Sequence, residues 1–228
     1  MLERSGGHPE GHPEAPGAFI ALEGIEGCGK STQIARICAY LERRGLSCLA
    51  TREPGGTPLG DALRQILLAP DNQSMDGLTE LFLLEAARRA HVQEVILPAR
   101  HQGRIVISDR FSDSSVAYQG AGRGLGVERV ERLNRLATDG LEPDLTFLLD
   151  LPAEIGLARV ADRARARDRM EREVIAFHER VRQGYLDLAR RRGERYAVID
   201  ARQPEEQVFA RVRERLEPLL GLAPSDSG

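Results

Sequence analysis

The chain has 228 residues, a length typical of one compact domain, and its 41% hydrophobic and 29% charged residues are those of an ordinary globular protein. A net charge of −3 gives no reason to expect a nucleic-acid partner. No apolar run approaches the ~18 residues that span a bilayer, and the N-terminus lacks the apolar segment of a secretory signal, so the sequence predicts a cytoplasmic protein without a membrane partner. The cysteines, Cys28, Cys38 and Cys48, lack metal-ligand spacing and predict reduced thiols, not a zinc site or a disulfide.

Both ends of the chain differ in composition from its middle. Residues 1–17 contain GHPE twice and almost no apolar side chain, which predicts a disordered tail. Residues 221–228 predict a loose C-terminal tail. A single domain over residues 18–220 is expected between them.

Short apolar runs alternate with helical patterns along this domain. Strands are predicted over 18–23, 47–51, 104–108, 145–150 and 196–200. Helices are predicted over 31–44, 78–100, 127–138, 153–161, 171–192 and 204–220, and the segment REPGGTP after the second strand is interpreted as a loop. This order predicts an α/β fold with a doubly wound, five-stranded parallel sheet flanked by helices. Ligands of such sheets bind beyond the carboxyl ends of the strands, where Gly24, Arg52 and Asp109 are expected.

The first strand leads into a phosphate-binding motif. Residues 24–31 fit G-x-x-x-x-G-K-[ST], and the motif opens the first predicted helix, which indicates a P-loop NTPase. Its glycines let backbone N–H groups surround phosphate oxygens, Lys30 reaches the β- and γ-phosphates, and the Ser31 hydroxyl binds Mg²⁺. Lys30 is the single lysine beside 31 arginines, as expected where a compact ammonium is needed. The residues predicted to hold the ATP phosphates are Gly24, Ile25, Glu26, Gly27, Cys28, Gly29, Lys30, Ser31 and Thr32.

Hydrolysis as the main activity is disfavoured. A signalling GTPase needs N-K-x-D and D-x-x-G, and neither is present. A transport or motor ATPase usually ends a buried strand in Asp-Glu, whereas the strands here end in Asp109-Arg110 and Asp150-Leu151. Arg52 and Arg110 follow strands at the ligand-binding edge, and arginine forks suit phosphate oxygens. The pattern favours transfer of a phosphoryl group to an anionic acceptor.

Residues 163–169 read RARARDR, with Arg163, Arg165 and Arg167 at alternate positions. A continuous helix does not place alternate residues on one face. Two interpretations stay open: a solvated helix end, or an arginine-rich lid over about 162–170 that closes on the triphosphate.

These motifs resemble those of the bacterial thymidylate kinases, which phosphorylate dTMP to dTDP with ATP for dTTP synthesis. The resemblance covers about residues 18–216. It rests on the P-loop with its internal acid Glu26, the arginine loop TREPGGT at 51–57, AAR at 86–88, ISDRFSDSSVAYQ at 107–119 and PDLTFLLD at 143–150.

The resemblance implies a role for each matching position. Arg52 and Arg110 hold the dTMP phosphate, Glu26 contacts the 3′-hydroxyl, and Tyr118 crowds the 2′ position. The thymine is read by Arg88, Ser115 and Gln119. Leu84 stands where the family usually has a stacking Phe, which puts strictness for thymine in question. Asp109 and Ser31 arrange Mg²⁺, and catalysis is assigned to Lys30, Arg52, Asp109, Arg163, Arg165 and Arg167.

The resemblance also implies a homodimer. A P-loop kinase for another nucleotide or small metabolite remains an alternative, as does a non-catalytic ATP-binding switch. The switch is disfavoured because it has no need for a second anion site.

Overall fold

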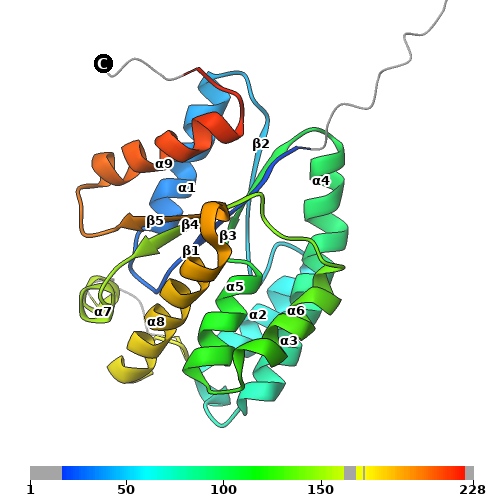
Figure 1. The fold of residues 1–228 in the computed structure, drawn as a ribbon. Helices are drawn as coiled ribbons and strands as arrows, with labels where there is room; N and C mark the ends of the chain where they lie inside the picture. The colour runs from blue at the N-terminus through cyan, green and yellow to red at the C-terminus, as the bar shows by residue number, and fades with distance from the viewer. Residues whose placement is uncertain (1–16, 162–167, 172, 224–228) are drawn as a thin grey trace, which may run out of the picture.

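The computed structural model describes residues 17–161, 168–171 and 173–223. Its strands form one parallel sheet in the order β2-β3-β1-β4-β5 (Figure 1). They are β1 (Phe19–Glu23), β2 (Cys48–Arg52), β3 (Ile105–Asp109), β4 (Leu145–Asp150) and β5 (Tyr196–Asp200). The predicted α/β fold and five-stranded parallel sheet are confirmed.

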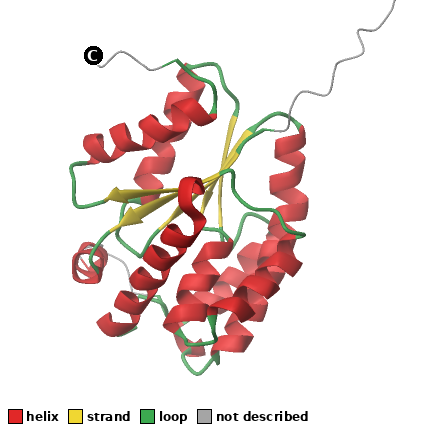
Figure 2. Ribbon diagram, viewed as in Figure 1, coloured by secondary structure: helices red, strands yellow, loops and turns green. Residues whose placement is uncertain are grey.

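Helices connect these strands and flank the sheet (Figure 2). The helices are α1 (Lys30–Arg43), α2 (Pro58–Leu68), α3 (Gly77–His91), α4 (Leu97–His101), α5 (Ser112–Ser115), α6 (Val127–Thr138), α7 (Ala153–Ala161), α8 (Ile175–Arg192) and α9 (Glu205–Leu219). Two π-helical segments, Val92–Ile96 and Val116–Gly122, follow α3 and α5 directly, and short 3-10 turns cover Pro70–Asn72 and Gly193–Arg195.

Side chains alternate between the two faces of β1, because successive residues of a strand point in opposite directions. Ile20 and Leu22 belong to the cluster that includes Ile37 of α1. Phe19 and Ala21 pack in a second cluster with the π-helical segment after α3. Burial on both faces is expected of a central parallel strand, and it leaves the carboxyl end of β1 as the place where polar groups gather.

The strand ends lie level at that edge. Leu22 pairs with Asp109, and Arg52 pairs with Asp109 on its other side. The P-loop, Arg52 and the aspartate–arginine pair therefore emerge beside one another, as the sequence predicted.

Several segments differ from the predictions. No helix was predicted over 112–122, where α5 and the π-helical segment that follows it lie. Helix α2 begins within the predicted loop REPGGTP, because Thr57 accepts a hydrogen bond from the backbone N–H of Gly60 and Pro58 occupies the first turn. The predicted helix over 78–100 is helical throughout but is divided into α3, a π-helical segment and α4. Helix α8 begins at Ile175, four residues after the predicted start at 171.

The predicted tails and lid fall largely outside the described residues. This holds for the lid arginines Arg163, Arg165 and Arg167. Within the described chain, Gly17 is bonded through its backbone to Arg100. None of the described helices is long and apolar enough to cross a membrane.

Candidate active site

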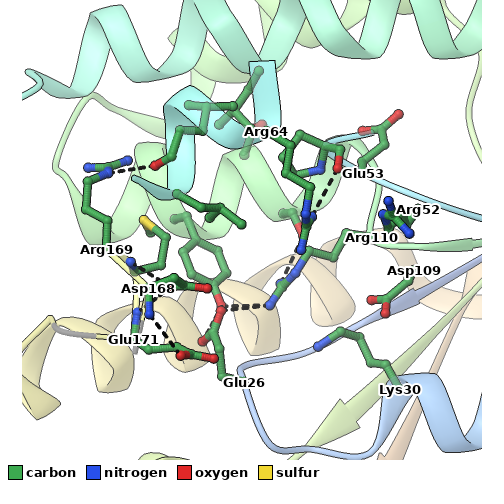
Figure 3. A pocket seen from close by; sticks show the side chains of 18 of the residues that line it. Glu26, Lys30, Arg52, Glu53, Arg64, Asp109, Arg110, Asp168, Arg169 and Glu171 are labelled. Carbon is green, nitrogen blue, oxygen red and sulfur yellow. Dashed lines mark hydrogen bonds and ion pairs between the residues drawn. The ribbon is translucent and has the colours of Figure 1, made fainter. Parts of the chain in front are cut away.

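A cavity of about 270 Å³ opens at the carboxyl ends of β1, β2 and β3. Figure 3 shows Lys30, Asp109 and Arg52 on one side and Asp168, Arg169 and Glu171 on the other. The predicted site residues that line it are Glu26, Gly27, Gly29, Lys30, Ser31, Thr32, Arg52, Leu84, Arg88, Asp109, Arg110, Ser115, Tyr118 and Gln119. Gly24, Ile25 and Cys28 belong to the same loop but do not line the cavity.

Three glycines give the P-loop its backbone conformation. Gly24, Gly27 and Gly29 have φ of 136°, 76° and 97°, in the region that favours glycine. A Cβ on Gly27 would lie 2.3 Å from the carbonyl oxygen of Gly156, so a side chain does not fit there. The loop ends where α1 begins, at Lys30, which directs the positive end of the helix toward the cavity.

The Lys30 side chain extends back across the P-loop and bonds to backbone carbonyl oxygens at its start. Its Nζ donates to the carbonyl oxygens of Gly24 and Ile25 at 3.0 and 3.1 Å, and lies 3.5 Å from Cys28 Sγ. The side chain is buried, so its ammonium is directed into the loop and not into solvent. An anion bound there meets both the lysine and the backbone N–H groups.

Ser31 and Asp109 face each other at the edge of the cavity. The Ser31 hydroxyl donates to Asp109 Oδ2 at 3.4 Å. Hydroxyl and carboxylate oxygens are the ligands that Mg²⁺ prefers. Within the described residues, no group of three or more His, Cys, Asp or Glu could hold a metal. The donor set therefore fits Mg²⁺ that takes most of its ligands from water and substrate phosphates.

Arg110 is fixed through both its backbone and its side chain. Its φ of 74° is unusual for a residue with a Cβ, and its N–H donates to the Leu22 carbonyl at 2.9 Å. The guanidinium donates from Nη2 to Glu26 at 2.9 Å and to the Tyr118 hydroxyl at 3.1 Å. Burial alone would raise the pKa of Glu26, but Arg110, with Lys30 and His178, holds that pKa well below its usual range. The loop acid is therefore a carboxylate at neutral pH.

Arg88 lies at the floor of the cavity in a buried polar network. It donates to Glu53 at 2.8 Å, to Glu85 at 2.7 Å and to the Ser115 hydroxyl at 3.1 Å. Burial would raise the pKa of Glu53, but the Arg88 charge holds it below its usual value. Arg88 is 2% exposed, so it supports the local fold as well as facing the cavity.

Gln119 leaves one polar atom free beside this network. Its Nε2 donates to Glu80, while its buried Oε1 has no hydrogen-bond partner in the described part of the chain. Buried acceptors are almost always paired, so this atom is available to a ligand.

Several residues of the cavity were absent from the predicted site, among them Arg64, Glu80 and Arg169. Arg64 of α2 donates to the Pro54 carbonyl at 3.0 Å, and burial, with the charges of Arg52 and Arg110, lowers its pKa. Glu80 and Arg169 form a buried ion pair, and Arg169 also donates to the Leu67 carbonyl at 2.8 Å. Arg64 was missed with α2 itself. The long-range contact of Arg169, across 89 positions, had no local signal in the sequence.

The chain is similar in sequence to known thymidylate kinases. The family model for thymidylate kinase matches residues 22–212. A thymidylate kinase of Desulfosudis oleivorans is 52% identical over 205 residues, covering 87% of this chain and 96% of that protein. A thymidylate kinase of Pseudomonas putida is 52% identical over 192 residues, covering 84% and 91%.

A solved structure agrees with these relatives. The thymidylate kinase from Ehrlichia chaffeensis superposes with a TM-score of 0.71 at 36% identity, covering 89% of this chain and 99% of that one. Sequence, fold and site geometry lead to the same conclusion: the chain belongs to the thymidylate kinase family, as its motifs predicted.

Proposed function

We propose that this protein transfers the γ-phosphoryl group of ATP to dTMP, which yields dTDP and ADP for dTTP synthesis. The observation that carries the proposal is a single cavity lined both by the P-loop and by the arginines of a second anion site. Arg110 and Glu26 join the two parts. A non-catalytic ATP switch has no use for the second part.

The ATP phosphates occupy the P-loop, residues 24–32, beside Lys30. Mg²⁺ is held at Ser31 and Asp109, where the two oxygens are 3.4 Å apart. When bound, the metal ion neutralises charge on the phosphate oxygens. The lid arginines Arg163, Arg165 and Arg167 add positive charge over the triphosphate.

The acceptor occupies the other end of the cavity. Arg52 and Arg110 hold its phosphate, and Arg64 adds a third guanidinium within the same cavity wall. Glu26 accepts a hydrogen bond from the 3′-hydroxyl of the deoxyribose, and the Tyr118 ring occupies the space beside the 2′ position. The unpaired Oε1 of Gln119 accepts a hydrogen bond from an N–H group of the pyrimidine ring.

The remaining base contacts come from α3 and α5. Arg88 and Ser115 read the thymine edge, and Leu84 covers the ring with an apolar surface. This assignment explains why an apolar side chain lines the acceptor end of the cavity, because a nucleobase buries a flat apolar face when it binds.

The reaction needs no general base. The second pKa of a monophosphate is near ~6, so its oxygen is already a nucleophile at neutral pH. Glu26 joins the P-loop to Arg110, and its lowered pKa makes it a poor proton carrier. Catalysis consists of bringing two polyanions together and stabilising charge in the transition state, which Lys30 and the arginines do.

We also propose a homodimer. Three large apolar side chains are exposed on neighbouring helices: Leu59 and Ile66 on α2 and Phe82 on α3, with exposed fractions of 52, 46 and 54%. A second copy that covers this surface would remove them from water. Light scattering after size exclusion is expected to give twice the chain mass, and Phe82→Glu is expected to give the monomer.

Binding of dTMP without ATP tests the proposed function. Isothermal titration of the nucleotide-free protein is expected to show one dTMP per chain, and Arg110→Ala is expected to lose at least ~10-fold in affinity, the scale of a charge-assisted hydrogen bond. Absence of dTMP binding, or equal binding by Arg110→Ala, would contradict the acceptor site.

A further inference from the structure

Three buried oxygen atoms form a triangle behind Arg110. Glu23 Oε2 lies 2.6 Å from the Ser114 hydroxyl and 2.8 Å from the Tyr185 hydroxyl, and the two hydroxyls are 2.8 Å apart. Glu23 Oε1 is occupied separately by the backbone N–H of Phe111 at 2.8 Å. Glu23 and Tyr185 are 0% and 1% exposed, and of the three residues only Ser114 lines the cavity.

The number of hydrogen atoms decides how these contacts are made. Three oxygen–oxygen contacts of this length need three hydrogen atoms, one for each hydrogen bond. The hydroxyls of Ser114 and Tyr185 supply two. The third belongs to the Glu23 carboxyl group, so the triangle is complete when Glu23 is protonated.

The triangle is joined directly to Arg110. Arg110 Nη1 shares its two hydrogen atoms among the Gly24 carbonyl oxygen at 3.0 Å, the Tyr185 hydroxyl at 3.1 Å and the Ser114 hydroxyl at 3.3 Å. A guanidinium only donates, so both hydroxyls must present lone pairs to it. They do so when their own hydrogen atoms are used inside the triangle.

We propose that Glu23, Ser114 and Tyr185 form a positioning cluster that orients Arg110 toward the acceptor phosphate. Glu23 acts through the two hydroxyls and is a positioning residue. This inference rests on the proposed role of Arg110 in binding dTMP, and it adds a cause for the orientation of that arginine.

The buried environment of Glu23 makes the positioning cluster sensitive to pH. Burial raises the pKa of Glu23 to about 7, although the Arg110 charge opposes the rise. The other titratable groups that face it are Asp113 on α5, Tyr185 on α8 and Tyr196 on β5. Above neutral pH Glu23 loses its proton, one contact of the triangle loses its hydrogen bond, and a negative charge appears behind the phosphate-binding arginine. Affinity for the dTMP dianion therefore falls on the alkaline side.

Two buried tyrosines provide a matched pair for the first test. The hydroxyls of Tyr185 and Tyr196 each lie against a buried acidic side chain, Glu23 at 2.8 Å and Asp113 at 2.7 Å, but of the two tyrosines only Tyr185 also accepts from Arg110. Tyr185→Phe is expected to raise KM for dTMP about 10-fold, equivalent to about 1.4 kcal/mol, with KM for ATP and kcat changed less than about 3-fold. Tyr196→Phe is expected to leave all three within about 2-fold. Equal effects of the two variants on KM for dTMP would overturn the inference.

Glu23→Gln provides the second test. The amide brings one hydrogen more than the three contacts use, so the orientation of Arg110 is disturbed at every pH. KM for dTMP is expected to rise about 5-fold, less than a full charged hydrogen bond, and the alkaline fall in kcat/KM for dTMP seen in the wild type is expected to disappear. A wild-type pH profile in Glu23→Gln would overturn the inference.

Failure of this inference is distinguishable from failure of the proposed function. If Arg110→Ala loses dTMP binding while Tyr185→Phe and Glu23→Gln behave as wild type, Arg110 binds the phosphate without the cluster. If Arg110→Ala keeps wild-type dTMP binding, the proposed acceptor site itself is wrong.

Discussion

The guanidinium of Arg110 donates a 2.9 Å hydrogen bond to the Glu26 carboxylate, which joins the loop after β3 to the P-loop (Figure 3). The Tyr118 hydroxyl donates to the same carboxylate at 2.8 Å. The donor and acceptor sites are thus built on one connected set of side chains. A shift of the P-loop on nucleotide binding would move Arg110 with it.

Lys30 is expected to be indispensable for turnover. Lys30→Ala removes the one ammonium directed into the P-loop, and kcat is expected to fall at least ~10²-fold, as when one major electrostatic donor is lost. Arg36→Ala, on the same helix but paired with Glu205 and Glu206 at the surface, is the control and is expected to retain wild-type turnover. A steady-state assay of ADP release measures both. Near-wild-type kcat in Lys30→Ala would refute its role.

Asp109 is expected to determine the requirement for Mg²⁺. Asp109→Asn keeps the shape but removes the charge beside Ser31, so the Mg²⁺ concentration for half-maximal rate is expected to rise about 10-fold or more, because hard cations depend on carboxylate charge. Asp187→Asn removes the charge of an exposed ion pair with Arg190, and this control variant should need the same Mg²⁺ concentration for half-maximal rate as the wild type. The same Mg²⁺ dependence in both variants would exclude Asp109 from the metal site.

Arg88 is expected to serve both stability and base recognition. Arg88→Ala leaves buried Glu85 without its ion-pair partner and leaves buried Glu53 with His91 alone, which is expected to lower the free energy of unfolding by about 3–5 kcal/mol. The adjacent Arg89→Ala removes an exposed pair with Asp139 and is expected to cost less than about 1 kcal/mol. Urea denaturation compares the two. If Arg88→Ala folds, its affinity for dTMP is expected to fall while its affinity for ATP stays unchanged. An equal loss of affinity for both nucleotides would argue against a role of Arg88 in recognising the thymine base.

The sequence predicted the fold more fully than the site. Helices α6 and α7 and strands β4 and β5 have the predicted bounds because their apolar periodicity is uninterrupted. Helix α2 was not predicted because the glycines of REPGGTP are typical of a loop, although Thr57 and Pro58 form a helix start there.

Several of the site residues that escaped prediction share one property. Their partners are distant in sequence, as for Glu23 with Tyr185, separated by 162 positions, and Glu80 with Arg169, separated by 89. Local spacing identifies a loop that surrounds phosphate, but a buried carboxylate at a strand end becomes interpretable only once the helices that cover it are placed.

Leu84 is expected to limit affinity for the base. Leu84→Phe would supply ring stacking, worth about 1–3 kcal/mol per base in nucleic-acid sites, and is expected to lower KM for dTMP by about 5-fold or more. Leu136→Phe makes the same substitution on the exposed surface of α6, outside the cavity, and serves as the control. Unchanged KM for dTMP in Leu84→Phe would show that this position does not face the thymine ring.

Glu23 is expected to make stability depend on pH. Its pKa is raised from 4.5 to about 7 in the folded protein, so between these values the folded state binds a proton that the unfolded state has released. The free energy of unfolding therefore falls as pH rises through this window, by about 3 kcal/mol for this group. Urea denaturation of wild type and Glu23→Gln at pH 4.5 and pH 8 should show the wild type losing stability relative to the variant. A pH-independent difference would mean that Glu23 does not titrate in this range.

The most direct test of the central claim is a coupled ADP-release assay with ATP and Mg²⁺ against dTMP, dUMP, dCMP, dGMP and AMP in parallel. The account predicts turnover with a strong preference for dTMP, because the acceptor end of the cavity combines phosphate-binding arginines with the base-reading groups Arg88, Ser115 and Gln119. Turnover that is equal across the five monophosphates, or absent with dTMP, would contradict it.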